Sequence, residues 1–199
     1  MSICVPTLDG QGKRLWDCLN AIECYTDPAL REIVIADCAG ALLGYTRPMA
    51  AAMGAASGRF LVALNDDVEV SEDWLEPLLV ALQTGAWCAT PDSDQNGPIL
   101  LFAPHCMAWT AKAWREIGGL DERFIHHCSD IDIARRLVDA GHPPVRVPTP
   151  HPITHHGSAS SAGHVKALAD ICQADLDRYV QKWRVTAEQD KHRLAAALR

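Results

Sequence analysis

The stretch FLVALNDDVEV, residues 60–70, places an apolar run directly before three polar residues. Phe60–Leu64 has the composition of a buried strand, which Asn65, Asp66 and Asp67 end abruptly. Two adjacent carboxylates repel each other, and a carboxylate without a partner is costly to bury. The stretch therefore predicts a strand end at which solvent, backbone donors or a cation must stabilise a polar site.

Composition narrows the class of protein. The chain has 199 residues, of which 48% are hydrophobic, which suits one globular domain with a sizeable core. A formal net charge of -7 argues against broad attraction to nucleic acid, so no nucleic-acid partner is expected. The eight cysteines contain no CxxC pair, and no apolar run reaches the ~20 residues of a membrane span. We expect free, buried thiols and a cytoplasmic protein, associated with a membrane only through a partner or acceptor.

The segments before residue 85 alternate between strand and helix patterns. SICVP and EIVIAD are strand-like, and apolar residues at helical spacing lie between them. The alanine-rich TRPMAAAMGAAS leads into the strand at residue 60, and Ser71 is positioned to cap a following helix. This order predicts an α/β fold with a mostly parallel, Rossmann-like central sheet flanked by helices.

The later half is less regular. ILLF and CMAWT suggest mixed strands, and VRVP suggests a last strand. Two short helices are expected between them, one stopped by Gly118 and Gly119 and the other by Gly141. A helical tail from about residue 163 is expected to pack back on the domain. No repeat or linker indicates a second domain.

Polar residues follow three of the predicted strands. Pro6 and Thr7, then Asp37, then Asn65, Asp66 and Asp67 stand at carboxyl ends, where open parallel sheets bind ligands. Carboxylates beside phosphate and water are the usual ligands of Mg²⁺ or Mn²⁺. The alternative is that Asp66 and Asp67 are turn residues that bind only local backbone.

Seven motifs in order resemble the family 2 glycosyltransferases. They are SICVPTL, EIVIADCAG, ASGRFLVALNDDVEVSEDWLEPLL, GGLDERF, SDIDIARRLVDAG, ITHHGS and DRYVQKW. The resemblance spans nearly the whole chain and implies the GT-A fold in a single domain, with a nucleotide-binding half (1–90), an acceptor-side half (91–162) and a helical tail (163–199). It implies transfer of a sugar from a nucleotide-diphosphate donor, with inversion, to a glycan, lipid-linked or protein acceptor.

The resemblance also assigns roles to the strand-end residues. Asn65-x-Asp67 takes the place of the Asp-x-Asp motif that binds Mn²⁺ or Mg²⁺, with Asp67 as a ligand and Asn65 a departure from the pattern. Asp66 then contacts the ribose or the ion. Asp37 reads the base of a UDP, GDP or dTDP donor, and Pro6 and Thr7 line the same pocket.

The resemblance places the catalytic base and a second metal-binding residue later in the chain. Asp130 aligns with the base that removes the acceptor proton, although Ser129 stands where the family has another acid. Ser129 followed three residues later by Asp132 resembles a capping box, which predicts a Ser129 cap and favours a structural role for Asp132 at a helix start. His155 rather than His156 is preferred for the metal or diphosphate. The weaker acceptor-side candidates are Gly119, Asp121, Glu122 and Trp109, the last of which suits the core equally well.

Two alternatives to an active transferase remain open. Asn65 and Ser129 also suit a non-catalytic relative that binds a nucleotide sugar or a glycan. A zinc protein built from HHC at 126–128 and HH at 155–156 has suitable soft ligands but lacks paired ligand spacings.

Overall fold

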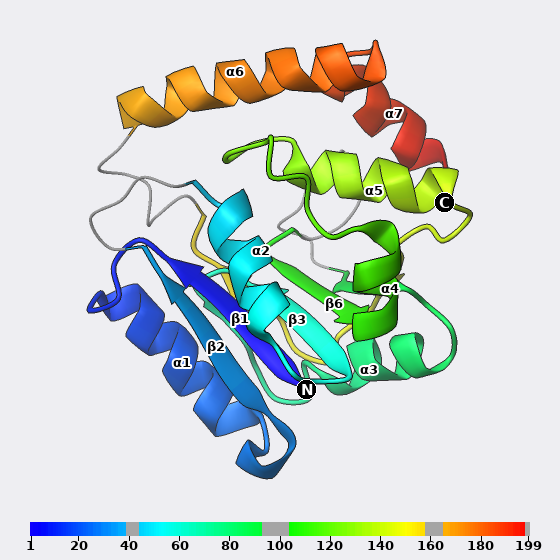
Figure 1. Cartoon of the computed structure of the whole chain (residues 1–199). Helices are drawn as coiled ribbons and strands as arrows, with labels where there is room; N and C mark the ends of the chain where they lie inside the picture. The colour runs from blue at the N-terminus through cyan, green and yellow to red at the C-terminus, as the bar shows by residue number, and fades with distance from the viewer. Residues whose placement is uncertain (39–43, 93–103, 158–164, 198–199) are drawn as a thin grey trace.

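A computed structural model describes residues 1–38, 44–92, 104–157 and 165–197 (Figure 1). Its centre is a six-stranded sheet in the order β2-β1-β3-β6-β5-β7, beside a two-stranded sheet of β4 and β8. The strands of the large sheet are β1 (Ser2–Thr7), β2 (Glu32–Asp37), β3 (Phe60–Leu64), β5 (Cys88–Pro91), β6 (Cys106–Thr110) and β7 (Val145–Val147). Those of the small sheet are β4 (Val68–Glu69) and β8 (Thr154–His155).

The first three strands form the predicted parallel unit. Helix α1 (Lys13–Tyr25) and the 3-10 turn η1 (Pro28–Leu30) connect β1 to β2, and α2 (Thr46–Ala55) connects β2 to β3. Strand β1 pairs in parallel with β2 along its whole length, but with β3 only through Ser2–Cys4. The order of strands across the sheet thus reverses at β1, with β2 on one side of it and β3 on the other. The carboxyl ends of β1 and β3 are not paired with each other.

The later strands are mixed, as predicted. Strand β6 runs antiparallel to β3 and β5, whereas β5 and β7 are parallel. The expected strand ILLF lies outside the described residues. The remaining pairs of the large sheet are parallel, which confirms a mostly parallel sheet.

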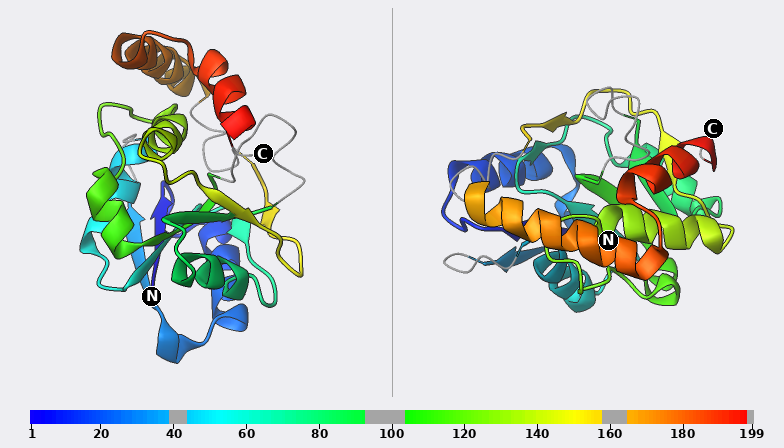
Figure 2. Two further views of the ribbon diagram at one scale, coloured as in Figure 1. Left: turned by 90° about the vertical axis from the view of Figure 1, so that its right-hand side faces the viewer. Right: turned by 90° about the horizontal axis from the view of Figure 1, so that it is seen from above.

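Helices cover both faces of the sheet, as the two views of Figure 2 show. Alternating strand residues divide between two cores: Cys4 faces α2 and the later helices, whereas Ile3 and Val5 face α1 and α3 (Glu76–Gln83). This period of two is the expected pattern of a strand buried on both faces. Trp109 is fully buried in the first of these cores and packs edge-on against Trp114, so its role is in the core.

Helix α3 begins later than the sequence indicated. The expected cap Ser71 lies outside it, and its buried hydroxyl has no hydrogen-bond partner within the described residues. Asp73 has a φ of 54°, which interrupts helical geometry, and Pro77 then occupies the first turn, where its missing N–H costs nothing. Trp74 is nevertheless fully buried, so the apolar pattern was correct although the cap was wrong.

The two short helices end where glycines were expected to end them. Helix α4 (Ala111–Ile117) is followed by Gly118 with a φ of 81°, and α5 (Ser129–Asp139) by Gly141 with a φ of 79°. Both glycines adopt the left-handed conformation that commonly closes helices.

The tail forms two helices that pack on α5. Helices α6 (Val165–Trp183) and α7 (Ala187–Ala197) are separated by residues 184–186, of which Arg184 has a φ of 61°. Buried Asp190 accepts a hydrogen bond of 2.6 Å from the Tyr179 hydroxyl and pairs with Arg135 of α5 at 2.5 Å. The tail therefore contributes to the core, as the sequence predicted.

Asp132 has the structural role favoured by the sequence, but through different contacts. The residue preceding α5 is Cys128, with a φ of 65°, and no side chain caps the helix, so the predicted Ser129 cap was wrong. The fully buried Asp132 carboxylate instead accepts hydrogen bonds from Lys182 at 2.5 Å, Trp183 at 2.8 Å and Arg136 at 2.9 Å. It joins α5 to α6.

We expect Asp132→Ala to lower the free energy of unfolding by roughly 3 kcal/mol, because two cations then lose a buried partner. Urea denaturation of both proteins measures this difference. Asp132→Asn should recover part of the loss, since the amide oxygen still accepts the Trp183 N–H bond. Equal stability of all three proteins would show that the buried carboxylate contributes nothing.

Two further observations concern the environment of the chain. Within the described ranges, no helix combines the length and apolar character that crossing a bilayer demands. All eight cysteines are free, as predicted, and five of them are buried, whereas Cys24 is exposed.

Candidate functional site

The site is built at the carboxyl ends of β1, β2 and β3. Thr7 and Asp37 are register partners at the ends of β1 and β2, and Asn65 follows β3. The strand order reverses at β1, with β2 on one side of it and β3 on the other, and such a topological switch point is where open α/β sheets bind ligands. The fold therefore brings the predicted strand-end residues to one edge.

Thr7 and Asp66 meet directly. The Thr7 hydroxyl donates a 2.7 Å hydrogen bond to Asp66 Oδ2 and accepts one of 3.1 Å from the Asp9 backbone N–H. Asp66 is only 8% exposed, so this contact satisfies a buried carboxylate. The contact joins the ends of β1 and β3 beyond the point where the strands stop pairing.

Asp67 meets His155 across the small sheet. Strands β4 and β8 are antiparallel with Val68 opposite His155, and the His156 N–H donates to the Asp67 carbonyl oxygen at 3.0 Å. This ladder places His155 Nε2 3.2 Å from Asp67 Oδ1. His156 points elsewhere and contacts Glu69 at 2.6 Å. The geometry thus distinguishes the two histidines, with His155 beside the carboxylate.

His105 belongs to the same cluster, and sequence reasoning missed it. Its ring stacks on that of His155 with centroids 4.4 Å apart, and its carbonyl oxygen accepts the Asn65 N–H. Burial, together with the nearby His155, lowers the pKa of His105 to about 4, so its ring is neutral at pH 7. Its buried Nε2 has no hydrogen-bond partner within the described residues. The only signal for this role in the sequence was a histidine just before β6.

These residues fit a hard divalent cation. The buried Asn65 Oδ1 has no partner within the described part of the chain, which leaves an oxygen available as a ligand or acceptor. Neighbouring ligands of octahedral Mg²⁺ lie about 3 Å apart, close to the 3.2 Å between Asp67 and His155. No group of three or more His, Cys, Asp or Glu side chains that could hold a metal occurs in the described ranges. A site for Mg²⁺ or Mn²⁺ needs only one or two carboxylates when substrate phosphate and water complete it.

The same finding counts against the zinc alternative. His126, His127 and Cys128 and the pair His155–His156 all lie within the described residues, yet they do not form a metal-binding group. Zinc sites need three or four protein ligands in one place. The zinc reading of these residues was wrong.

Asp37 lies at the exposed end of β2 with its carboxylate against the loop after β1. A side chain at Gly10 would begin 2.0 Å from Asp37 Oδ2, so the carboxylate would have to shift to accommodate one. Pro6, one residue before the end of β1, is buried and pairs in register with Ala36. Because β3 stops pairing with β1 at Cys4, Pro6 needs no N–H toward that side.

Asp130 stands in the first turn of α5, half-buried. The Tyr45 hydroxyl is close to it: burial and the Asp130 carboxylate both raise the pKa of Tyr45. Gly44 is required here, because its φ is 72° and a side chain would begin 2.2 Å from the Ile125 carbonyl oxygen. The start of α2 and the loop before α5 therefore meet beside Asp130.

A carboxylate from the tail shapes this loop. Asp175 of α6, 0% exposed, accepts backbone hydrogen bonds from Ile125, His126 and His127 at 2.8–3.0 Å and pairs with Arg178 at 2.7 Å. Three consecutive N–H groups on one carboxylate restrict the loop conformation. Sequence reasoning missed Asp175, because only the fold brings α6 to this loop.

The GGLDERF segment is held by the tail as well. The Asp121 carboxylate binds Arg123 at 2.6 Å and Lys182 at 2.8 Å. Gly119 packs against the Trp114 ring, which would lie 3.2 Å from an added side chain, and Glu122 is exposed. These contacts give Gly119 and Asp121 structural roles, and their acceptor-side role remains a prediction.

The pKa of Asp121 yields a pH-dependent prediction. Arg123 and Lys182 lower that pKa below its ordinary value of 3.8, so the unfolded chain takes up this proton first as pH falls. The contribution of Asp121 to stability is then complete above about pH 4 and is lost below it. We expect the melting temperature of the wild type to exceed that of Asp121→Asn at pH 7, and the difference to shrink by pH 2.5. A difference that grows on acidification would contradict this assignment.

Comparison with known proteins identifies the fold. The chain matches no protein-family model and no curated protein. Solved structures of glycosyltransferases do match it, and their shared architecture shows that this chain has the GT-A fold.

Three of these structures illustrate the likeness. TarS of S. aureus, residues 1–349, has a TM-score of 0.64 at 12% identity, covering 98% of this chain and 69% of TarS. The mannosyltransferase PcManGT of Pyrobaculum calidifontis, solved with GDP-Man and Mn²⁺, has a TM-score of 0.58 at 13% identity, covering 98% and 74%. The Drosophila β1,4-galactosyltransferase 7 catalytic domain, with xylobiose, has a TM-score of 0.56 at 13% identity, covering 78% and 70%. At such identities the likeness establishes the fold alone.

Proposed function

We propose that this protein is a metal-dependent, inverting glycosyltransferase of family 2 that uses a nucleotide-diphosphate sugar. The observation that carries the proposal is the Asp67–His155 pair, 3.2 Å apart at the switch point of a GT-A fold. Two solved structures of this fold contain a nucleotide sugar together with manganese, namely PcManGT and a mutant of galactosyltransferase 7.

In this proposal, Asp67 and His155 hold Mn²⁺ or Mg²⁺, and the Asn65 amide oxygen lies beside them. The cation would neutralise the charge that develops on the departing diphosphate. The chain itself supplies preorganisation: the β4–β8 ladder fixes His155, and the stacked, neutral His105 restricts the orientation of its ring.

The donor nucleotide would lie across the ends of β1 and β2. The exposed Asp37 carboxylate can accept N–H groups of uracil, thymine or guanine, so UDP, dTDP and GDP donors all remain candidates. Pro6 and Thr7 line the pocket, and Asp66 is oriented by Thr7 toward the ribose or the ion.

Asp130 is assigned as the general base. Its carboxylate would accept the proton of the acceptor hydroxyl while the hydroxyl oxygen attacks the anomeric carbon and the nucleotide diphosphate leaves. A single displacement of this kind inverts the configuration. The Asp175-bound loop and the start of α2 hold the first turn of α5 in place.

The same proposal assigns functions to the segments of the chain, a cellular compartment and a class of acceptor. We assign residues 1–90 to nucleotide binding, 91–162 to the acceptor, and 163–199 to the tail, within one domain. Eight free thiols suit a reducing cytoplasm. The acceptor is a glycan, a lipid-linked sugar or a protein.

A non-catalytic binder is the second candidate. Asn65 replaces a charged ligand, and Ser129 stands beside the proposed base, so this chain carries fewer acidic groups than the resemblance implies. Such a protein would bind the donor but transfer no sugar.

Thermal-shift measurements with UDP-, GDP- and dTDP-sugars, with and without Mn²⁺, test the donor site. A ligand that binds only the native state stabilises it and so raises the melting temperature. At a ligand concentration of 100 times the Kd, the stabilisation is about 2.7 kcal/mol. We expect one nucleotide class to raise it, and Mn²⁺ to enlarge the shift. No shift with any donor would refute the proposed site.

A further inference from the structure

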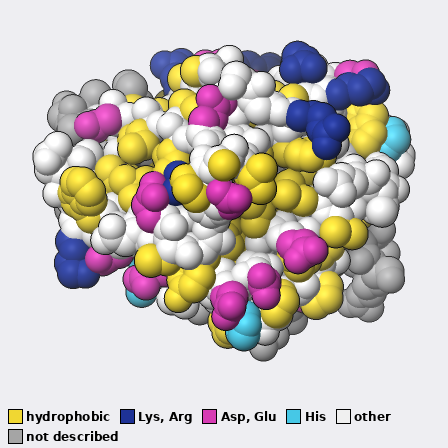
Figure 3. Space-filling view, turned by 90° about the horizontal axis from the view of Figure 1, so that it is seen from below, with side chains coloured by type: hydrophobic (Ala, Val, Ile, Leu, Met, Phe, Trp, Pro, Cys, Tyr) yellow, Lys and Arg dark blue, Asp and Glu magenta, His cyan; other side chains and the backbone are white. Residues whose placement is uncertain are grey.

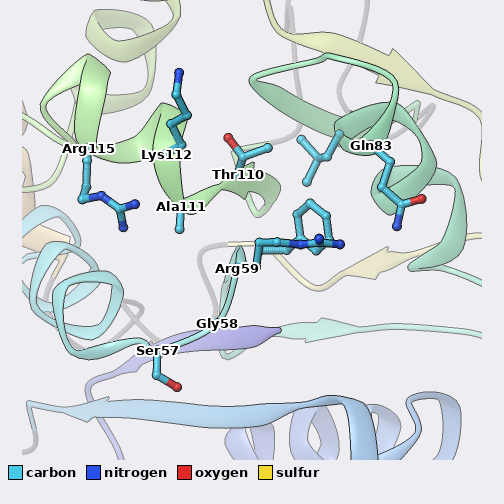
Figure 4. A pocket seen from close by; sticks show the side chains of 10 residues that line it. Ser57, Gly58, Arg59, Gln83, Thr110, Ala111, Lys112 and Arg115 are labelled. Atoms are coloured by element: carbon cyan, nitrogen blue, oxygen red, sulfur yellow. The ribbon is translucent and has the colours of Figure 1, made fainter.

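A second pocket lies at the opposite edge of the sheet from Asp67 and His155. It encloses about 600 Å³ at the start of β3, between α4 and the end of α3 (Figure 4). The five residues of β3 separate it from Asn65 by roughly 16 Å. The proposed donor site does not use this pocket.

Three cations line the pocket within a chain of net charge -7. Lys112 pairs with Glu116 at 2.8 Å, and Figure 4 shows it extending away from Arg59. Arg59 and Arg115 form no ion pair with any described residue. Arg59 directly precedes β3 and Arg115 belongs to α4. Like charges that line one pocket repel each other, and a bound anion would offset that repulsion.

In another basic pocket, each cation is neutralised by a carboxylate. Arg123, Arg178 and Lys182 line a pocket of about 410 Å³, and each pairs with a carboxylate at 2.6–2.8 Å. The pocket beside Tyr25 and Leu30 is lined by acidic residues, namely Asp27, Asp73 and Glu76. Among these three pockets, only the one at Arg59 is lined by two cations that have no carboxylate partner within the described residues.

The other pocket residues add hydrogen-bonding groups and an apolar floor. The Arg59 guanidinium lies 4.7 Å from the centre of the Phe60 ring and extends toward Gln83, on the other side of the pocket from Arg115 (Figure 4). The Thr110 hydroxyl oxygen accepts the Ala113 N–H, so its own O–H proton is available to a ligand. The Ser57 hydroxyl already donates a hydrogen bond of 3.0 Å to the Glu32 carboxylate.

The surrounding surface is not generally basic. Figure 3 views this end of the molecule from below and shows acidic side chains across its centre, among hydrophobic ones, with Lys and Arg toward the margins. A non-specific polyanion surface would need a broader basic area. The pocket is therefore a small basic site on a face that is otherwise mainly acidic and hydrophobic.

We propose that this pocket binds a ligand carrying two or more phosphate-type oxyanions. The planar, forked guanidinium groups of Arg59 and Arg115 match such oxygens in bidentate fashion. Two arginines on separate segments of the chain favour a ligand that bridges them over a single anion. The inference is independent of the glycosyltransferase proposal, because it concerns the other edge of the sheet.

Titration calorimetry with tripolyphosphate in metal-free buffer tests the proposal, with inorganic phosphate as the single-anion comparison. We expect tripolyphosphate to bind at least tenfold more tightly than phosphate, and Arg59→Gln/Arg115→Gln to weaken it at least tenfold. Both side chains are exposed, so the melting temperature of the variant should stay unchanged. Hydrogen exchange should slow on binding at residues 57–60 and 110–115.

The matched control is Arg14→Gln/Arg184→Gln, which removes the same charge from two exposed arginines that, like Arg59 and Arg115, form no ion pair with any described residue. It should bind tripolyphosphate like the wild type. Equal weakening in both double variants, protection confined to the β1–β3 strand ends, or no binding by the wild type would each overturn the proposal. None of these outcomes depends on a nucleotide sugar, so the donor site is tested separately.

Discussion

Asp130→Asn should reduce sugar transfer by about 10²- to 10⁴-fold while leaving donor affinity unchanged. The amide keeps the size and a hydrogen-bonding group of Asp130 at the start of α5 but cannot accept the acceptor proton. Initial rates with the donor identified by thermal shift, together with donor Kd and melting temperature on the same preparation, measure the three effects.

The purely structural reading of Asp130 predicts a different result. A carboxylate in a first helical turn contributes about 0.3–1 kcal/mol through the helix dipole, so turnover would hardly change. Asp170→Asn, an exposed carboxylate of α6, is the matched control and should leave the rate unaltered. Wild-type turnover by Asp130→Asn would exclude it as the base, and a wild-type protein that binds donor without any turnover would establish the binder.

Asp67→Ala should abolish the Mn²⁺-dependent part of donor binding without unfolding the protein. The change removes the carboxylate that lies 3.2 Å from His155, and a single imidazole beside a neutral amide holds a hard cation poorly. Donor Kd with Mn²⁺ and with chelator is the measurement. In the variant the two values should coincide.

Two comparisons separate the metal from its surroundings. Glu69→Ala removes a nearby carboxylate that pairs with His156, and it should retain the Mn²⁺ effect. Asp37→Ala should weaken donor binding equally with and without Mn²⁺, because a base contact does not pass through the ion. A Mn²⁺ effect of wild-type size in Asp67→Ala would remove Asp67 from the metal site.

Local pattern predicted most of the elements and their types. The run Phe60–Leu64 became β3 with the stated bounds, and the helices around Trp114 and Ile131 ended at the expected glycines. These predictions succeeded because strand burial and helix termination depend on neighbouring residues. The capping predictions at Ser71 and Ser129 failed, since a cap also depends on backbone geometry imposed by packing, such as the φ of 65° at Cys128.

The composition of the strand ends determined the kind of site, because carboxylates and an amide directly after buried strands predict a polar edge of the sheet. Only the tertiary structure decided which partners complete it. His155 reaches Asp67 through the β4–β8 ladder, His105 stacks on His155, and Asp175 holds the loop before Asp130. These contacts join segments far apart in the chain, and sequence spacing carries no information about which distant side chains share a buried volume.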